Sequence, residues 1–311
     1  MNKTPRISVI IPTYNHSNYV VETLESVLAQ SFNDFEIIVV NDGSTDNTVE
    51  VLNPFIEKGL IQYYEQENKG QASARNLGFK HACGEYIAFL DDDDIFPINK
   101  LETQLNRMQG TSIAAIGGVS GRIIEGKIQY PACENEEQIF KFEDIFDGSP
   151  FYSPGQVLIS SKHLKAVNGF DSEIWGADDL DLWMRLSKHG DIIKTPEIAL
   201  WYRVHSGNSS LQTTRMLKNI RTVIIKNSKT YQNKFKEKLR RKGYRFLFYY
   251  LGVEIVWKIK RSIKHFQIFS LFKHTYILIS YFLIPAIKDA TLAKNIVLSL
   301  CPKRFLKNTI D

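Results

Sequence analysis

Short apolar runs that alternate with helical patterns are the feature of this sequence that most restricts its fold. Four runs rich in β-branched or aromatic residues are typical of strands: ISVIIP (7–12), FEIIVV (35–40), IQYYE (61–65) and EYIAFL (85–90). The segments between them have helical spacing: 18–30, 46–57 and 71–82. Strands rich in Val and Ile, separated by helices, predict an α/β fold with a mostly parallel sheet and helices on both faces.

Polar residues follow three of these strands directly. They are Thr13-Tyr14-Asn15, Asn41-Asp42-Gly43-Ser44, and the run from Asp91 to Asp94. In open parallel sheets, ligands bind at the carboxyl ends of the strands. The sequence therefore predicts that these clusters meet at one binding site.

The four adjacent aspartates at 91–94 give the strongest signal of chemistry. Carboxylates this close repel one another, and a divalent cation such as Mn²⁺ or Mg²⁺ relieves that repulsion. Alternation along an extended chain would send Asp91 and Asp93 to the same side, where they could share the ion. The alternatives are a solvated acidic turn, or Asp94 acting as the cap of a following helix.

Two further candidates flank the second and third predicted helices. Asp42 and Gly43 form a turn after a buried strand, which a well-capped strand–turn–helix unit would also explain. Arg75 lies near the start of the helix expected over 71–82, where a cation and the helix N-terminus could attract a phosphate or a base edge. The alternative for Arg75 is an exposed helix residue.

The segment 176–210 supplies two more candidate sites, a cluster of aspartates and a histidine. GADDLDLWMRL (176–186) places Asp178, Asp179 and Asp181 on the first turn of an expected helix, where acids are also favoured by the helix dipole. The functional reading is a general base that takes a proton from an acceptor hydroxyl. His205, in WYRVHSGNSS (201–210), could complete a metal site or contact phosphate, or could be a surface residue.

The order of these motifs is more informative than any one of them. ISVIIPTYN, VVNDGSTDNT, NKGQASARNLG, EYIAFLDDDD, NGFD, DDLDLWMRL and YRVH follow one another from Ile7 to about Ser210. This series closely resembles the family 2 glycosyltransferases of the GT-A fold, which is Rossmann-like. The resemblance covers about two thirds of the chain and implies an enzyme with a nucleotide-sugar donor, most simply a UDP-sugar.

The resemblance also implies roles for individual positions. Pro12, Thr13 and Tyr14 match the strand end that contacts the base and ribose, Asp42 matches the carboxylate that reads them, and Arg75 matches an arginine near the base. Asp91 and Asp93 match the D-x-D pair, with Asp91 nearer the ribose and Asp93 the direct metal ligand. Asp179 matches the catalytic base, and His205 matches a histidine close to the metal or diphosphate.

The sequence departs from the family pattern at two places. The usual Glu-Asp pair reads Asp178-Asp179, which leaves the expected base intact. Asp92 stands between the D-x-D aspartates where small residues are common, so Asp92 is also a donor-site candidate and the metal pair could instead be Asp92 and Asp94.

The family is inverting, so the implied reaction is a single displacement at the anomeric carbon by a glycan or lipid-linked acceptor hydroxyl. One alternative is a non-catalytic, membrane-associated protein that binds a nucleotide-sugar. The other is a nucleotidyltransferase, which is disfavoured because no Gly-rich loop with a following Arg or Lys lies near the N-terminus.

The distribution of charge predicts a domain boundary near residue 210. Residues 1–210 carry a net charge of −13, whereas residues 211–311 contain 22 Lys and Arg against four acids, a net charge of +18. We therefore expect a catalytic domain over 1–210 and a basic, mainly helical region over 211–311. That region suits an anionic membrane surface, and no recognisable module suggests nucleic acid.

Within the basic region, 244–273 has the spacing of one amphipathic helix, with apolar residues near 248, 251, 255, 259, 263 and 266. The most apolar run, 275–287, has 13 residues and is too short to span a bilayer, which takes ~20. The alternative is a helical appendage packed on the catalytic domain. Three widely spaced cysteines and an N-terminus unlike a secretory signal favour the cytoplasm, at the inner face of the cell membrane.

Overall fold

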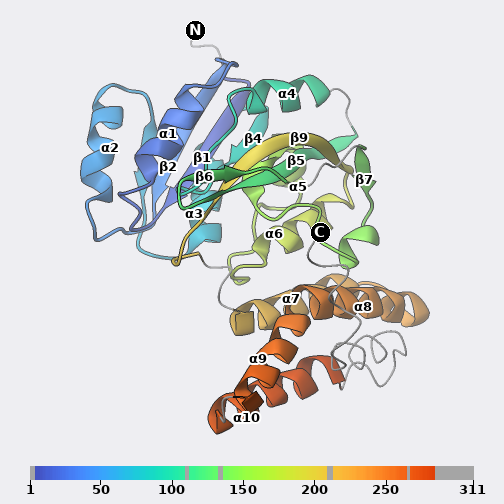
Figure 1. Cartoon of the computed structure of the whole chain (residues 1–311). Helices are drawn as coiled ribbons and strands as arrows, with labels where there is room; N and C mark the ends of the chain where they lie inside the picture. The colour runs from blue at the N-terminus through green and yellow to red at the C-terminus, as the bar shows by residue number, and fades with distance from the viewer. Residues whose placement is uncertain (1–3, 109–111, 132–135, 209–212, 265–266, 284–311) are drawn as a thin grey trace. The chain divides into compact units, whose positions relative to one another are not determined.

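A computed structural model of the chain describes residues 4–108, 112–131, 136–208, 213–264 and 267–283 (Figure 1). The chain divides into two compact units. The first comprises Met1–Ile145 and Ser149–Ser209, and the second comprises Phe146–Gly148 and Ser210–Asp311.

The first unit is built on one nine-stranded sheet with the order β3-β2-β1-β4-β8-β5-β9-β7, and β6 pairs with β5 at the side. The strands are β1 (Ile7–Thr13), β2 (Phe35–Asn41), β3 (Gln62–Glu65), β4 (Tyr86–Phe89), β5 (Ile113–Ile124), β6 (Lys127–Gln129), β7 (Gln138–Phe140), β8 (Val157–Ser160) and β9 (Asp191–Val204). The helices of this unit are α1 (Val20–Leu28), α2 (Thr48–Glu57), α3 (Gln71–His81), α4 (Lys100–Arg107), α5 (Ser161–Ala166) and α6 (Asp178–Leu186), with the 3₁₀ turn η2 (Pro154–Gln156). A second 3₁₀ turn, η1 (Asp144–Phe146), begins in this unit, and its last residue counts with the second unit.

The predicted strands and helices of the first 90 residues are confirmed to within two residues at each end. β1 pairs in parallel with β2 and β4, and β2 pairs in parallel with β3. β5 and β9 are also parallel, but β8 is antiparallel to both β4 and β5, and β7 is antiparallel to β9. The expected α/β fold is confirmed, with the antiparallel pairings confined to the second half of the sheet.

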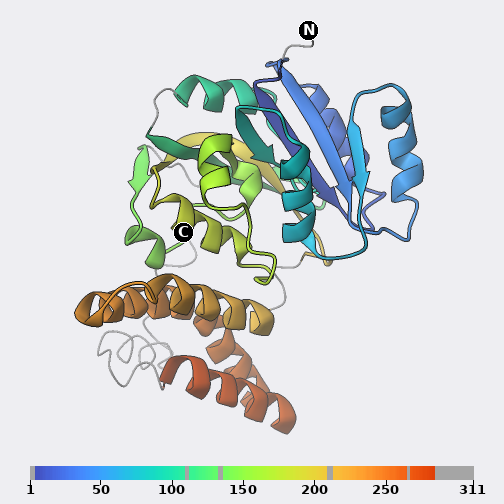
Figure 2. The same ribbon diagram turned by 180° about the vertical axis from the view of Figure 1, so that it is seen from behind.

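Both faces of the parallel strands are covered, as the runs of Val and Ile predict (Figures 1 and 2). Alternate residues of β1 pack with α1 on one face, in a cluster that includes Val9 and Leu24. On the other face Ile10 meets Gly78 of α3, where an added Cβ would lie 2.4 Å from the Ile10 Cγ2. The small residue at 78 therefore lets α3 lie directly on the sheet.

The strand order creates a switch point beside β1. The chain moves outward from β1 to β2 and β3, and then returns to the opposite side of β1 as β4. Ligands of open α/β sheets bind at the carboxyl ends of the strands at such a point. The polar clusters after β1, β2 and β4 all lie at this edge.

The second unit is helical, as expected for the basic region. It contains α7 (Thr213–Ser228), α8 (Asn233–Leu247), α9 (Val253–Lys264) and α10 (Ile268–Leu278), with π-helical segments η4 (Phe248–Gly252) and η5 (Ile279–Leu283). Gly243 of α8 lies so close to α7 that an added Cβ would be 2.8 Å from Ile224 Cγ1. No helix in the described part of the chain is both long and apolar enough to cross a membrane.

The single amphipathic helix predicted over 244–273 is wrong. The π-helical segment η4 separates α8 from α9, and α10 is a further helix. Four residues of the predicted membrane face, Phe248, Leu251, Ile255 and Ile259, are at most 8% exposed, because they form the core of the unit. The side chain of residue 263, residue 266 and residues 284–287 of the apolar run lie outside the described residues.

Candidate functional site

The four aspartates follow β4 in a tight turn held by backbone contacts. The Asp94 amide donates to the Asp91 carbonyl at 3.1 Å. Thr23 of α1 donates its hydroxyl to the carbonyls of Asp92 and Asp94, at 2.9 Å in each case. Because the backbone is fixed in this way, the four carboxylates leave the turn in different directions and meet different partners.

Asp91 faces α3. Its Oδ1 accepts from Arg75 Nη2 at 2.6 Å and from Gln71 Nε2 at 2.8 Å. Ser153 Oγ donates to its Oδ2 at 3.4 Å. One oxygen of Asp91 is therefore neutralised by a guanidinium, and only the other faces the remainder of the site.

Asp92 faces the loop that follows β1. Its Oδ2 accepts from the Tyr14 amide at 3.2 Å, and its Oδ1 lies 2.7 Å from His16 Nδ1. This hydrogen bond raises the pKa of His16 to about 8, against the opposing effect of burial. His16 therefore carries a positive charge at neutral pH and leaves Asp92 paired.

Asp93 points to the loop that follows β9. Its Oδ2 lies 2.8 Å from His205 Nε2, and the His205 ring lies 5.8 Å from the ring of His16. Burial, and then the charges of Asp92 and Asp91, raise the pKa of Asp93 to about 6. A carboxylate in this state is one that a cation would stabilise.

Asp94 is fully buried and holds the end of β9. Its Oδ1 accepts from the Arg203 amide at 2.9 Å, and burial raises its pKa well above the usual value. Because its side chain is 0% exposed, Asp94 does not reach a solvent-borne ion. The geometry therefore favours Asp93 over the alternative pair of Asp92 and Asp94.

Arg75 joins the aspartate turn to the start of α6. Its Nη2 donates to Asp91, and its Nη1 donates to Asp178 Oδ2 at 2.9 Å. The guanidinium carbon lies 5.1 Å from the centre of the Phe170 ring, and Arg75 is only 2% exposed. The exposed helix residue considered from sequence is therefore wrong, and the guanidinium already has two carboxylate partners.

Asp179, on the first turn of α6, is half-buried beside this ion-pair network. Its Oδ1 accepts from the Leu180 amide at 2.7 Å. Burial, and then the negative charge of Asp178, raise its pKa to about 7. A carboxylate with a pKa near neutrality is suited to accept a proton at neutral pH.

The carboxyl ends of β1 and β2 supply the rest of the predicted site. Pro12 and Thr13 are buried in β1, whereas Tyr14 is 44% exposed. Asp42 is buried, and its carboxylate accepts from Gln66 Nε2 at 2.7 Å and from the amides of Lys69 and Gly70, each at 2.8 Å. Asp42 therefore fixes the loop that leads into α3.

Several residues that contact the aspartates were not predicted: His16, Gln71, Ser153 and Arg203. His16 directly follows the Thr13-Tyr14-Asn15 cluster, and Gln71 precedes Arg75 by one helical turn, so position alone could have suggested them. Arg203 lies two residues before His205 in the YRVH motif, so its position was also a signal. Ser153 had none, because it lies outside the strands, before η2, and a long-range contact brings it to Asp91.

The expected metal ligands are brought together only in part. Asp93 and His205 are in contact, whereas Asp91 binds Arg75. Within the described residues, no group of three or more His, Cys, Asp or Glu side chains could hold an ion. The pair formed by Asp93 and His205 still fits an ion whose other ligands are phosphate oxygens and water, as is common for Mg²⁺.

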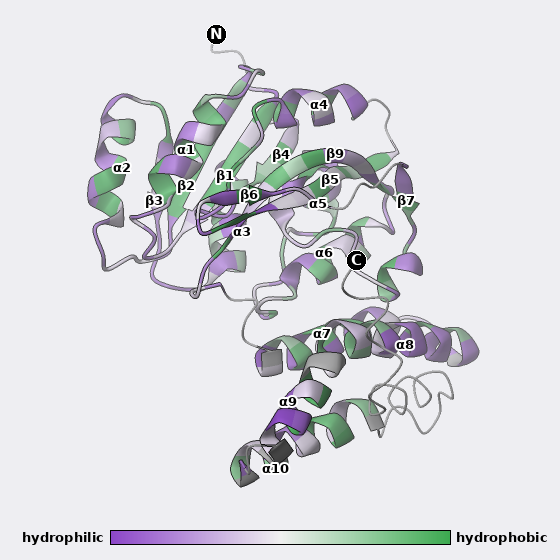
Figure 3. Ribbon diagram, in the orientation of Figure 1, coloured by the Kyte–Doolittle hydropathy of each residue, from purple (hydrophilic) through white to green (hydrophobic). Residues whose placement is uncertain are grey.

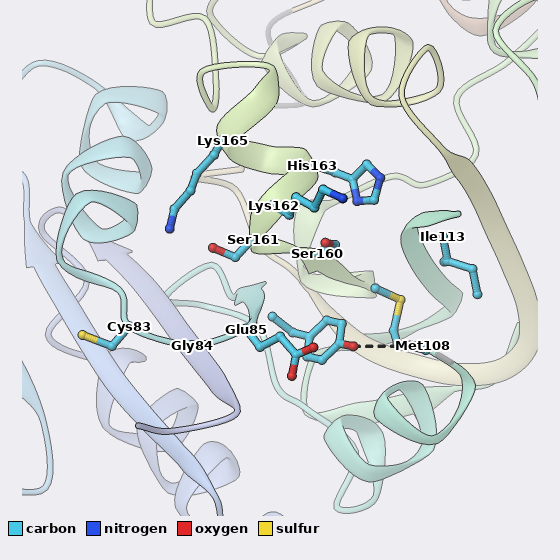
Figure 4. A pocket seen from close by; sticks show the side chains of 11 residues that line it. Cys83, Gly84, Glu85, Met108, Ile113, Ser160, Ser161, Lys162, His163 and Lys165 are labelled. Carbon is cyan, nitrogen blue, oxygen red and sulfur yellow. Dashed lines mark hydrogen bonds between the residues drawn. The ribbon is translucent and has the colours of Figure 1, made fainter. Parts of the chain in front are cut away.

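A pocket of about 720 Å³ lies away from this site, at the amino end of β4 (Figure 4). Tyr86, the first residue of β4, lines it and donates its hydroxyl to the Met108 carbonyl at 3.3 Å. Lys162, His163 and Lys165 of α5 also line it. None of the predicted site residues lies in this pocket, so it is separate from the aspartate turn at the other end of β4.

The sheet, its switch point and the acidic turn at that point define an α/β domain of the GT-A type. The family model described as Glycosyl transferase family 2 matches residues 8–167. The chain belongs to glycosyl transferase family 2, so the predicted family is confirmed. The first unit carries the domain of an enzyme that transfers sugars.

Curated relatives of this chain are also named as glycosyltransferases. An uncharacterised glycosyltransferase of Rickettsia bellii is 38% identical over 183 residues, covering 58% of this chain and 26% of the relative. One of Rickettsia prowazekii is 32% identical over 216 residues, covering 67% of this chain and 66% of the relative. The chain thus spans only about a quarter of the Rickettsia bellii relative.

Solved structures share the fold. The structure of TarS 1-349 of S. aureus superposes with a TM-score of 0.63 at 21% identity, covering 78% of this chain and 72% of that one. The mannosyltransferase PcManGT of Pyrobaculum calidifontis, in complex with GDP-Man and Mn²⁺, gives a TM-score of 0.62 at 19% identity, covering 96% and 81%. At these identities the likeness concerns the fold alone.

Proposed function

We propose that the protein is an inverting glycosyltransferase that moves a sugar from a nucleotide-sugar, preferentially a UDP-sugar, to a hydroxyl of a glycan or lipid-linked acceptor. The observation that carries the proposal is the double ion pair of Arg75. It ties Asp91, on the turn after β4, to Asp178, the neighbour of Asp179. A donor-binding edge and a candidate base thus belong to one connected site.

Asp179 is the proposed general base. It would take the proton of the acceptor hydroxyl as that oxygen bonds to the anomeric carbon and the bond from that carbon to the diphosphate breaks. A positioned base contributes roughly 10²–10⁴-fold to such a step. The pKa of about 7 supports this role, because much of Asp179 is deprotonated at neutral pH yet basic enough to accept a proton.

The nucleotide is proposed to lie against the ends of β1 and β2. Pro12, Thr13 and exposed Tyr14 would line the base and ribose, with Asp42, Asp91 and Asp92 behind them. Support comes from Thr13, whose hydroxyl oxygen is buried without a partner in the structure. The proposed part of Arg75 is indirect, because its guanidinium nitrogens Nη1 and Nη2 already hold Asp91 and Asp178. TarS has been solved with UDP and with UDP-GlcNAc, which supports a UDP-linked donor.

We assign a divalent ion, Mn²⁺ or Mg²⁺, to Asp93 and His205, with Asp91 Oδ2, which accepts only from Ser153 at 3.4 Å among the described residues, as a further candidate ligand. When bound there, the ion would neutralise charge on the departing diphosphate. The pKa of Asp93, raised by burial and then by the charges of Asp92 and Asp91, supports the assignment, since a cation beside the carboxylate would offset these effects. The Mn²⁺ in the PcManGT complex adds support.

The second unit is proposed to bind an anionic membrane surface on the cytoplasmic side. Its 22 Lys and Arg against four acids support this, since each cation near such a surface contributes about 1 kcal/mol. A membrane location would bring the active site to a lipid-linked acceptor. The alternative, a non-catalytic protein that only binds the nucleotide-sugar, would show donor binding without turnover.

Asp179→Asn tests the proposal directly. We expect the variant to bind UDP with Mn²⁺ as the wild type does, in calorimetry, and to lose at least about a hundredfold in turnover with a panel of UDP- and GDP-sugars. Asp144→Asn, which changes an exposed carboxylate outside the site, should keep full activity. Wild-type turnover by Asp179→Asn would show that another group is the base.

A further inference from the structure

The helix α10 carries an exposed apolar stripe. Phe269, Phe272, Tyr276 and Ile279 follow one another at intervals of three or four residues, so they lie on one side of the helix and its continuation. Their exposed fractions are 93%, 69%, 70% and 43%. We call these four residues the α10 stripe.

The α10 stripe differs from the part of α10 that holds the unit together. Ile277 and Leu278 are buried, and α10 packs against α9. The helix is therefore apolar on two sides, and among the described residues only one of them packs within the unit. In Figure 3, α10 carries many hydrophobic residues, whereas α8 is mostly hydrophilic. A contiguous exposed apolar surface of this kind indicates a partner.

The surroundings of the stripe identify the chemistry of that partner. Residues 213–283 contain 17 Lys and Arg and only two acids. Lys273, exposed on α10, follows Phe272, and on α9 the Lys260 Nζ lies 5.3 Å from the centre of the half-exposed Trp257 ring. Aromatic rings combined with long cationic side chains are typical of helices that lie at a bilayer surface. A second copy of this chain would bring an equally cationic surface, whereas anionic lipid has the complementary charge.

We infer that the α10 stripe inserts between the headgroups of an anionic bilayer, so that apolar insertion anchors the second unit and its cations attract it. The inference rests on the membrane attachment in the proposed function and names the residues that achieve it. It replaces the predicted face at 248, 251, 255 and 259, which is buried.

Vesicle flotation of the full chain tests this, with phosphatidylcholine alone and with phosphatidylcholine mixed with phosphatidylglycerol. At low salt both charge and insertion act. In about 1 M salt, where the screening length falls to about 3 Å, only insertion persists. We expect F269S/F272S/Y276S to lose at least about tenfold in high-salt partitioning to mixed vesicles, because three apolar side chains no longer enter the bilayer. Its low-salt attraction to anionic vesicles should persist.

The matched control is I98S/I128S/Y130S, which changes three exposed apolar residues of the first unit and should partition as the wild type does. Equal high-salt partitioning by the stripe variant would overturn the inference. So would a fall in its melting temperature without lipid, which would show that the protein itself covers the stripe, or a change from dimer to monomer in sedimentation.

A second readout does not depend on removing the stripe. In Phe272→Trp, lipids brominated on their acyl chains should quench the new tryptophan relative to wild-type protein, and unchanged emission would place residue 272 outside the bilayer. If the wild type binds no vesicle while sugar transfer proceeds, membrane attachment fails as a whole. If the wild type binds and the stripe variant binds equally, only the insertion of α10 fails.

Discussion

The Asp93 carboxylate lies 2.8 Å from the His205 Nε2, although 112 residues separate them along the chain. Asp93 follows β4, and His205 follows β9, a strand from the second half of the sheet. The contact therefore depends on the completed sheet. It also places an aspartate whose pKa is raised to about 6 against an imidazole, and carboxylate and imidazole are two ligand types that a divalent ion can share.

Loss of either member of this pair should weaken metal binding. We expect Asp93→Asn and His205→Ala each to raise the Kd for Mn²⁺, measured by calorimetry with UDP present, by about tenfold or more. Chelation should abolish sugar transfer, and added Mn²⁺ should restore it. Full transfer in excess EDTA would remove the ion from the reaction, and unchanged Kd values in both variants would remove these ligands.

The turnover rate should depend on pH through Asp179. Its pKa of about 7 lies above the ordinary value for a carboxyl, so the base is protonated and inactive below that pH. We expect kcat to rise as pH increases, to reach half of its maximum near pH 7 and to level off roughly one unit above that. Asp178→Asn removes the neighbouring negative charge that helps raise this pKa, so the rising limb should move to lower pH. A limb that stays in place would assign the titration to another group.

Arg75 should contribute strongly to stability. In Arg75→Met, Asp91 and Asp178 lose their shared cation while still largely buried, and breaking such a buried ion pair costs about 3–5 kcal/mol of unfolding free energy. Urea denaturation of the wild type and of the variant measures this loss. Arg107→Met is the control, because Arg107 also pairs with two acids, Glu137 and Glu197, but on the surface. It should lose less than about 1 kcal/mol. Equal losses of unfolding free energy in the two variants would show that burial does not make the ion pairs of Arg75 more stabilising than those of Arg107.

Gly78 should tolerate no side chain. In Gly78→Ala the new methyl group would lie 2.4 Å from Ile10 Cγ2, so α3 must move off β1. Overpacking of this kind costs about 1–3 kcal/mol, which opposes the ~1 kcal/mol that Ala gains over Gly in a helix. We expect a lower melting temperature by calorimetry. An added Cβ at Gly148 meets no atom within 4 Å, so Gly148→Ala should leave the melting temperature unchanged.

The parallel half of the fold could be predicted because each strand is a run of apolar residues buried on both faces. Ile7–Thr13 and Phe35–Asn41 are such runs, and the polar clusters after them mark the ligand edge. β8 could not be predicted in the same way. It has only four residues, and its place between β4 and β5 is set by long-range pairing.

The contacts of the candidate site residues could not be predicted from the sequence, and their roles in binding and catalysis stay predictions. Asp91, Asp93, Asp179 and His205 do converge on one region, but each has a protein partner that periodicity does not reveal. Arg75 illustrates this, because its spacing in α3 gives no sign that two carboxylates enclose it. The apolar spacing of 248–259 likewise predicted an exposed amphipathic face, since a buried helix of a small bundle has the same period.

The pairing of β8 with both β4 and β5 has a mechanical consequence. Leu158 of β8 pairs with Ala88 of β4 on one side and with Ile116 of β5 on the other. Through β8, the strand that precedes the aspartate turn therefore belongs to the same hydrogen-bonded sheet as β5 and β9, and β9 leads to His205. Moving β4 away from β5 would require one of these two ladders to break. A movement that admits or releases a ligand would therefore cost less in the loops at the carboxyl ends of the strands than in the sheet itself.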